Sequence, residues 1–238
     1  MDKQLRDQIK HDKFVEEVGH TVEYLKGHQD AVRKYGVVAA AVIVLAGAGY
    51  AYSGYQAGQR ENALRNATLV LDAFVGQQSP TGGQVFKTQA DKDAAAIKAF
   101  SEVASKYSGS REGLLARYYT GNLLCDQGKV SECEAAFKEV SKGGDANVAS
   151  LGKLSLATLY QSEGKNSEAE ALLRDLVAHP TAVVSKEQAQ LSLARAIMKT
   201  KPEEARIILN SLQALDRPAV TRSAVALLGE MSGQPQPR

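Results

Sequence analysis

The two cysteines are the side chains with the clearest potential for chemistry. Cys125 and Cys133 flank the turn DQGKVSE. In an oxidising compartment, a disulfide between them would close a short loop and stabilise the turn by about 2–3 kcal/mol. The alternative is that Cys133 is only a small packing residue, because helix geometry can hold two Cα atoms too far apart for a disulfide. The sequence leaves both interpretations open.

The other candidate groups form no recognisable site. His11, His20 and His28 lack the spacing of metal ligands, and His179 precedes Pro180 at an expected helix end, where a capping or surface role is ordinary. The sequence has no Walker loop, no HExxH or GxSxG motif and no CxxC pair. We therefore expect no enzymatic activity, no cofactor and no metal.

The composition favours helices and argues against nucleic acid as a partner. The 238 residues include 29 basic and 27 acidic side chains, a net charge of +2, which leaves no excess of basic groups for binding a phosphate backbone. Ala and Leu are plentiful, Trp is absent and Pro is scarce. No run of alternating β-branched residues is long enough to predict a sheet. These features predict an all-α fold.

One apolar segment is long enough to cross a membrane. Residues 36–55, GVVAAAVIVLAGAGYAYSGY, lie within the uncharged stretch between Lys34 and Arg60. About 20 helical residues span the ~30 Å of a bilayer core. A buried core helix rarely stays uncharged for so long, and a cleaved signal peptide has a much shorter leading region. Tyrosines flank the segment, as in an aromatic belt at the two membrane interfaces: Tyr35, Tyr50, Tyr52 and Tyr55.

The span divides the chain and sets its expected orientation. Basic residues precede it slightly more densely than they follow it, which favours a cytoplasmic N-terminus and a periplasmic C-terminal domain. Gly47-xxx-Ala51 and Gly54-xxx-Gly58 could join two spans in a homo-oligomer, although small residues are also simply frequent in membrane helices. The expected parts are a cytoplasmic amphipathic tail at 1–34, a transmembrane helix at 35–56, a repeat domain at 57–231 and a disordered tail at 232–238.

Beyond residue 60 the sequence repeats itself with a period of 36 to 37 residues. The segments AIKAFSEV, CEAAFKEV, AEALLRDL and ARIILNSL align, with a small residue first and large apolar residues four and seven positions later. Such spacing is one face of a helix packed closely on a neighbour. The small residues are Ala96, Cys133, Ala169 and Ala205, and the large ones are Phe100, Phe137, Leu173, Leu209, Val103, Val140, Leu176 and Leu212.

An expected partner helix precedes each later copy, so that each unit is a helix hairpin. Gly128 and Gly164 lie in turns where a helix must end in a left-handed residue, and Pro202 opens the helix after the third turn. The first copy is irregular: we expect a helix from Arg60 to about Val75 that continues the span, followed by the Gly-, Ser- and Pro-containing loop 76–89. The last helix, Pro218–Met231, lacks a partner and would cap the stack.

These hairpins resemble the tetratricopeptide repeat, whose period is about 34 residues. The usual large aromatic residue at the start of each repeat is replaced by Arg117 and Lys153. The fold class that follows is all-α, with one transmembrane helix and then an α-solenoid of tetratricopeptide-like hairpins. The matching positions are Gly121, Gly128, Cys133 and Phe137 in one repeat, and Ala157, Tyr160, Gly164, Ala169 and Leu173 in the next.

The resemblance implies a concave binding face formed by the leading helices. Basic side chains that would clamp a C-terminal carboxylate are missing there, except for Lys153 at the edge. An extended or helical peptide held by apolar and amide contacts is therefore the expected ligand, although each residue could instead be solvated surface or inter-repeat packing. By repeat register, the face includes Tyr118, Asn122, Asp126, Leu154, Thr158, Gln161, Gln190 and Ala194.

The order of parts resembles one particular family. The segment VGHTVEYLKGHQDAVRKYGVVAAAVIVLAGAGYAYSGYQ, followed by RENALRNATLVLDAF, is similar to the ancillary SecYEG translocon subunit family. The resemblance implies a single-pass bacterial inner-membrane protein whose periplasmic repeat domain serves as an interaction scaffold, with the secretion translocon, periplasmic chaperones or clients as partners. Two alternatives stay open: a self-associating structural protein of an envelope or division complex with the repeats as spacer, and a cytoplasmic-facing regulator.

Overall fold

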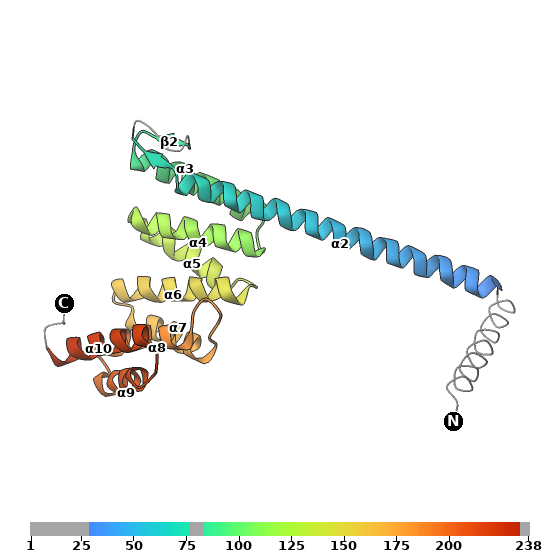
Figure 1. Ribbon diagram of the computed structural model, residues 1–238. Coiled ribbons are helices and arrows are strands. Elements are labelled where there is room, and N and C mark those ends of the chain that lie inside the picture. The colour runs from blue at the N-terminus through green and yellow to red at the C-terminus, as the bar shows by residue number, and fades with distance from the viewer. Residues whose placement is uncertain (1–28, 77–82, 234–238) are drawn as a thin grey trace, which may run out of the picture. The chain divides into compact units, whose positions relative to one another are not determined.

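The computed structural model describes residues 29–76 and 83–233, and it is almost entirely helical in these ranges (Figure 1). The expected tail at 1–34, with its three histidines, lies almost wholly outside the described residues, as do residues 234–238 of the expected C-terminal tail. The elements are α2 (Gln29–Leu71), β1 (Phe74–Val75), β2 (Val85–Phe86), α3 (Gln89–Lys106), α4 (Arg111–Asp126), α5 (Val130–Ser141), α6 (Ala146–Ser162), α7 (Asn166–Ala178), α8 (Lys186–Ile197), α9 (Pro202–Gln213) and α10 (Pro218–Ser232).

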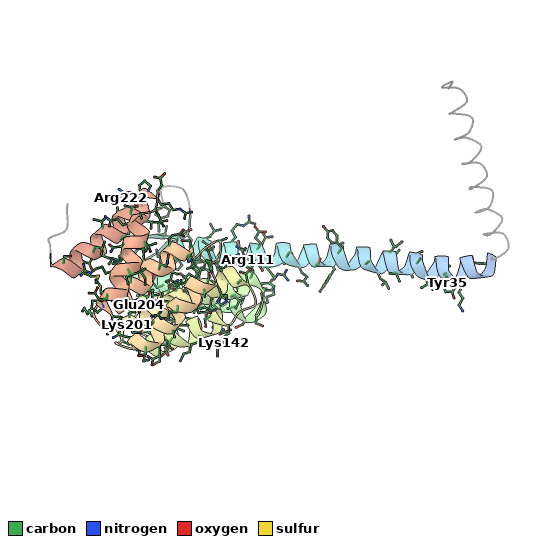
Figure 2. The ribbon with its side chains drawn as sticks, turned by 90° about the horizontal axis from the view of Figure 1, so that it is seen from below. Tyr35, Arg111, Lys142, Lys201, Glu204 and Arg222 are labelled. Atoms are coloured by element: carbon green, nitrogen blue, oxygen red, sulfur yellow. A yellow bond between two sulfur atoms is a disulfide. The ribbon has the colours of Figure 1, made fainter. Side chains whose placement is uncertain are left out.

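The chain divides into two compact units, Met1–Gly58 and Gln59–Arg238. In the first unit, the apolar segment is continuous helix, and large apolar side chains such as Ile43 and Leu45 are about 70% exposed (71% and 72%). Tyr35, near the start of the described helix, projects its ring outward (Figure 2). The stretch Arg33–Leu71 is long and apolar enough to cross a membrane. Exposed apolar surface on this scale needs an apolar environment to cover it.

The second unit is a stack of antiparallel helix pairs in which each helix packs on its neighbours in the sequence (Figure 1). The expected turn chemistry is confirmed: Gly128 and Gly164 have φ of +72° and +74°, which a side chain would strain. Pro202 occupies the first turn of α9. Ser110, Asp145 and Ser185 cap the N-termini of leading helices by accepting hydrogen bonds from backbone N–H groups. Local sequence thus fixes where most hairpins turn.

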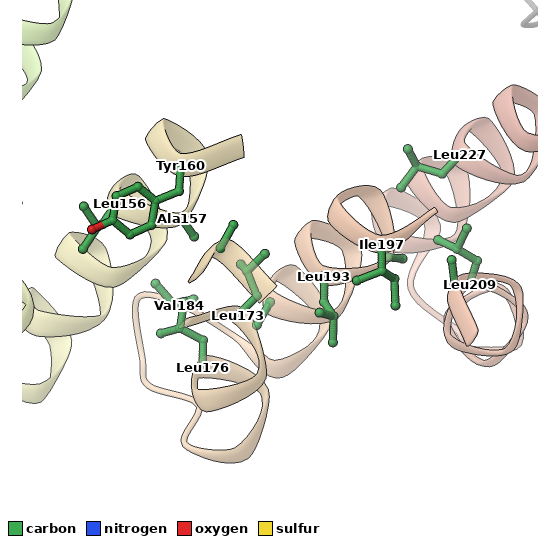
Figure 3. Close-up of a cluster of buried hydrophobic side chains, with 14 of the residues drawn as sticks. Leu156, Ala157, Tyr160, Leu173, Leu176, Val184, Leu193, Ile197, Leu209 and Leu227 are labelled. Carbon is green, nitrogen blue, oxygen red and sulfur yellow. The ribbon is translucent and has the colours of Figure 1, made fainter. Parts of the chain in front are cut away.

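The core confirms the repeat predicted from the sequence. The four aligned small residues are completely buried, at 0% exposure, and the aligned large ones are at most 6% exposed. Leu173 and Leu176 of α7 face Leu156 and Tyr160 of α6, and the cluster continues through α8 and α9 to Leu227 of α10 (Figure 3). Burying Leu or Ile side chains of this kind contributes about 1.5–3 kcal/mol each, which holds successive hairpins together.

Two glycines allow helices to approach more closely than side chains would permit. A Cβ on Gly152 of α6 would lie 2.7 Å from the backbone nitrogen of Ser141 in α5. A Cβ on Gly121 of α4 would lie 2.8 Å from the Phe137 ring. Of these two glycines, Gly152 tolerates a side chain less well, because its Cβ would meet backbone, which cannot move aside as the Phe137 ring can.

The first repeat departs from the expected irregular loop. The leading helix ends at Leu71, not near Val75, and Phe74–Val75 forms a strand that pairs in parallel with Val85–Phe86. Two-residue strands are too short for alternating side chains to predict them, which is why the sequence indicated only a loop. Ala67 of α2 packs with Phe100 of α3 in a separate buried cluster.

Candidate functional site

A groove runs between α4, α5 and α6. Its volume is about 510 Å³. The buried Phe137 ring lies at its base, half-buried Leu154 and Leu159 add apolar surface, and Val130 stands exposed at 39%. The remaining lining groups are small or polar, so the groove offers apolar contact with hydrogen-bonding groups around it. The full lining is Asn122, Cys125, Asp126, Val130, Phe137, Leu154, Ser155, Thr158, Leu159 and Ser162.

A second groove follows on the other side of α6. It has a volume of about 310 Å³ and is more polar than the first, with hydroxyl and amide groups from α6 and α8. Thr158 lines both grooves, so they adjoin at α6 on the face of the leading helices. We call this surface the α4–α8 groove. Its second part is lined by Thr158, Gln161, Gln188, Leu191, Ser192, Arg195, Ser223 and Leu227.

Most of the residues predicted for the binding face are brought together in this groove. Asn122, Asp126, Leu154, Thr158 and Gln161 all line it. Tyr118 and Gln190 do not line it; the half-buried Tyr118 ring packs 5.9 Å from the Phe137 ring, centroid to centroid.

The α8 residues are displaced by one position from the prediction. A constant period of 36 predicts that Ala194 lies on the surface, but Ala194 is completely buried. It occupies the place that Ala157 occupies in α6, so α8 follows α6 by 37 residues. As a result Leu191 takes the position expected for Gln190, and Arg195 takes the position of Thr158. The loop before α8, residues 179–185, is longer than the loop 142–145 before α6. Between equivalent positions, the interval from Ala169 to Ala194 is one residue longer than that from Cys133 to Ala157, and the interval from Ala194 to Ala205 is one residue shorter than that from Ala157 to Ala169.

This displacement brings a basic group into the groove that the sequence did not predict. Arg195 lines the second part and is exposed. Lys153, the basic residue expected at the edge, is instead held by Asp175 of α7, with Nζ 2.6 Å from Oδ2. The hydrogen bond from Lys153 holds the pKa of the Asp175 carboxyl below its ordinary value. Lys153 is thus part of the inter-repeat packing, and Arg195 is the cation that faces the groove.

Ion pairs outside the groove join consecutive repeats. Glu134 of α5 accepts from Lys138 at 2.7 Å and from the Tyr160 hydroxyl at 3.0 Å. One repeat later, Glu170 accepts from Lys201 at 2.6 Å and from Arg174 at 2.7 Å. These hydrogen bonds hold the pKa of each carboxyl below its ordinary value. The largest contribution comes from Lys138 for Glu134 and from Lys201 for Glu170. Arg174 also reaches Glu204, labelled with Lys201 in Figure 2.

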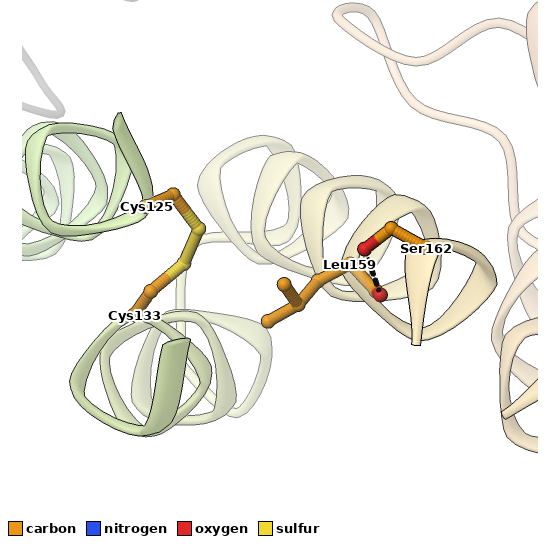
Figure 4. The surroundings of a disulfide bond; sticks show 4 residues. All are labelled: Cys125, Cys133, Leu159 and Ser162. Atoms are coloured by element: carbon orange, nitrogen blue, oxygen red, sulfur yellow. Dashed lines mark hydrogen bonds between the residues drawn. A yellow bond between two sulfur atoms is a disulfide. The ribbon is translucent and has the colours of Figure 1, made fainter. Parts of the chain in front are cut away.

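A disulfide closes the hairpin beside the groove. Cys125 at the end of α4 and Cys133 in the first turn of α5 are bonded, with Cα atoms 5.2 Å apart. This spacing is ordinary for a disulfide. Leu159 of the neighbouring α6 points toward the hairpin (Figure 4). Cys133 is also completely buried at the packing position that Ala fills in later repeats, so the residue serves both the bond and the core.

The fold and groove define an α-solenoid of helix hairpins, a class in which surfaces bind other proteins. The family model of the tetratricopeptide repeat-like domain matches residues 33–190, about two thirds of the chain, and the chain belongs to this family. Comparison with curated proteins and with solved structures gave no significant match. Within the described residues, no group of His, Cys, Asp and Glu side chains could hold a metal ion.

Proposed function

We propose that this protein is a membrane-anchored scaffold that binds other proteins in the α4–α8 groove and performs no chemistry. The observation that carries the proposal is that an apolar groove and a groove rich in amides and hydroxyls adjoin at Thr158. An extended peptide needs both kinds of contact along its length. Membership in the tetratricopeptide repeat-like family supports a protein ligand.

The proposed setting is the bacterial inner membrane, with α2 as the single span, the N-terminus in the cytoplasm and the repeat domain in the periplasm. The exposed apolar helix supports the span, and the Cys125–Cys133 bond supports an oxidising compartment. The resemblance of the order of parts to the ancillary SecYEG translocon subunits supports a role beside the secretion channel or in periplasmic quality control.

Site-specific photo-crosslinking in bacterial cells tests the proposed function. A photoreactive residue at Thr158, inside the groove, is expected to crosslink to translocon subunits, chaperones or secreted clients. The same residue at Ser211, exposed on α9 and outside the groove lining, is the matched control. Partners that appear equally from both positions would refute the groove as the binding surface.

The same experiment separates the scaffold from its main alternative. Crosslinks only between copies of this chain would favour a structural protein that self-associates, with the repeats as a spacer. Small residues in the span, including Gly47 and Gly54, have open space around them and are compatible with that alternative.

A reporter enzyme active only in the periplasm, fused after Arg238, tests the orientation: an inactive reporter would place the domain in the cytoplasm.

A further inference from the structure

The α4–α8 groove carries charge only at its two ends. Asp126, at the α4 end, and Arg195, at the α8 end, are the only ionisable side chains among the lining residues. The α6 side chains between them are apolar, hydroxyl or amide groups. A groove with a carboxylate at one end and a guanidinium at the other distinguishes the two ends of a ligand by charge.

Neither charged group is used by the fold. Within the described residues, the side chains of Asp126 and Arg195 take part in no hydrogen bond or ion pair, and both residues are exposed. Several other arginines of the domain are paired, such as Arg117 with Glu139 at 2.9 Å and Arg217 with Glu187 at 3.0 Å. Both groups are therefore free to bind a ligand.

The position of Asp126 supports the same interpretation. It is the last residue of α4, where the helix dipole places partial negative charge. A carboxylate there opposes the dipole, and no basic residue in the last turn of α4 compensates for it. Helix stability gives no reason for an acid at this place, whereas a cationic ligand group would be attracted by both the carboxylate and the helix end.

The apolar and polar parts of the groove are ordered between the charges. Val130, Leu154 and Leu159 lie in the same part as Asp126, and Gln161, Gln188 and Ser192 lie in the same part as Arg195. An aliphatic side chain thus fits beside the acidic end, and a peptide backbone can exchange hydrogen bonds with the amides near the basic end. Two steps between leading helices, about 10 Å each, require about six extended residues.

We propose that the groove selects extended protein segments by the order of their charges, which we call their polarity, whatever the chain direction. The preferred segment has a basic group at the α4 end, an aliphatic side chain next to it, and an acidic group or terminal carboxylate at the α8 end. This inference rests on the proposed function and specifies the ligand of the same groove. It requires charge complementarity at both ends simultaneously, so that segments of reversed polarity bind more weakly.

Defined peptides test the polarity. The probes are fluorescent, end-blocked hexapeptides with Leu beside Lys, Lys-Leu-Ser-Ser-Ser-Glu and Glu-Ser-Ser-Ser-Leu-Lys, which cover both chain directions. Their charge-reversed forms are Glu-Leu-Ser-Ser-Ser-Lys and Lys-Ser-Ser-Ser-Leu-Glu. Binding to the full-length protein in nanodiscs is measured at low salt. The better peptide of the first pair is expected to bind about 4–25-fold more tightly than either reversed form, since each of the two exposed ion pairs contributes about 2–5-fold.

A charge-swapped protein makes the test specific. The double variant Asp126→Lys/Arg195→Glu is expected to prefer the reversed peptides, and about 1 M salt should abolish both preferences. Arg206→Glu is the matched control, because Arg206 is also exposed and outside the groove. Its preference should equal that of the unmodified protein.

The outcomes separate this inference from the proposed function. Equal binding of all four peptides, or a swapped variant with unchanged preference, overturns the polarity even if crosslinking at Thr158 identifies partners. Absence of binding by every peptide at millimolar concentration also overturns it. Loss of crosslinks at Thr158 in cells, by contrast, would refute the proposed function itself.

Discussion

Removal of the Cys125–Cys133 bond should weaken the repeat domain by an amount that the structure allows us to estimate. The appropriate variant replaces both cysteines with alanine. Cys133 is completely buried, and Ala169 and Ala205 fill the same position in the next two repeats. Alanine therefore fits the packing, and the variant removes the crosslink without creating a large cavity.

The expected loss follows from the short loop that the bond closes. The two cysteines are separated by 8 positions in the sequence. The entropy of closing a loop of this length corresponds to about 2.5 kcal/mol at 25 °C. For a domain of this size, each kcal/mol lowers Tm by about 2–4 °C. The double variant should thus melt about 5–10 °C below the oxidised protein.

Circular dichroism at 222 nm on the full-length protein in detergent measures the effect. The oxidised protein is compared with the reduced protein and with the double variant, each with and without a reductant. Reduction should lower Tm of the unmodified protein to that of the variant and leave the variant unchanged. Mass spectrometry after alkylation verifies the state of the thiols.

Two results would refute the reasoning. Two free thiols in protein purified from membranes without reductant would mean that the bond does not form in the cell. A bond that is present, but whose reduction leaves Tm unchanged within about 1 °C, would mean that the hairpin is equally ordered without it, so the loop-entropy argument would fail.

Three further predictions concern packing, ion pairs and the span. Gly152→Ala should destabilise the domain by about 1–2 kcal/mol, because its Cβ would lie 2.7 Å from a backbone nitrogen of α5, whereas Gly229→Ala, with nothing within 4 Å, should stabilise it by up to about 1 kcal/mol. Glu170→Gln should reduce the free energy of unfolding at pH 7 by about 0.5–1 kcal/mol and flatten the decline of stability in acid. The reason is that the pKa of Glu170 is lower in the folded than in the unfolded protein, so its carboxylate stabilises the fold above the unfolded-state pKa, and this stability is lost as the pH falls through the folded-state pKa. Ile43→Asp should cost about 3 kcal/mol of insertion free energy and increase the fraction released by alkaline extraction of membranes.

Each of these predictions has a contrary outcome. The glycine reasoning fails if urea unfolding gives both variants the same sign. The ion-pair reasoning fails if Glu170→Gln loses as much stability between pH 6 and pH 3 as the unmodified protein does. The span assignment fails if the Ile43→Asp protein remains in the membrane pellet in the same proportion as the unmodified protein.

The sequence was sufficient for the architecture because architecture depends on local periodicity. A small residue followed by large apolar ones at helical spacing can be recognised without tertiary information. The aligned residues identified in this way, the first of which is Ala96 and the last Leu212, are buried in the core. Turn positions were equally local, since Gly128 and Gly164 adopt the left-handed conformation that ends a helix. The apolar helix that is long enough to cross a membrane is likewise a property of consecutive residues.

The groove depended on information that no local pattern contains. The interval from Ala169 to Ala194 is one residue longer than its counterpart in the preceding repeat, and the interval from Ala194 to Ala205 is one residue shorter, so the trailing helices keep a period of 36 and conceal the one-residue shift. Only the burial of Ala194 against neighbouring helices reveals the shift and places Arg195 in the groove. The pairing of Lys153 with Asp175 also joins residues of different helices. The sequence determined the elements and their buried faces, whereas tertiary packing decided which charges remain free, because that depends on contacts between helices.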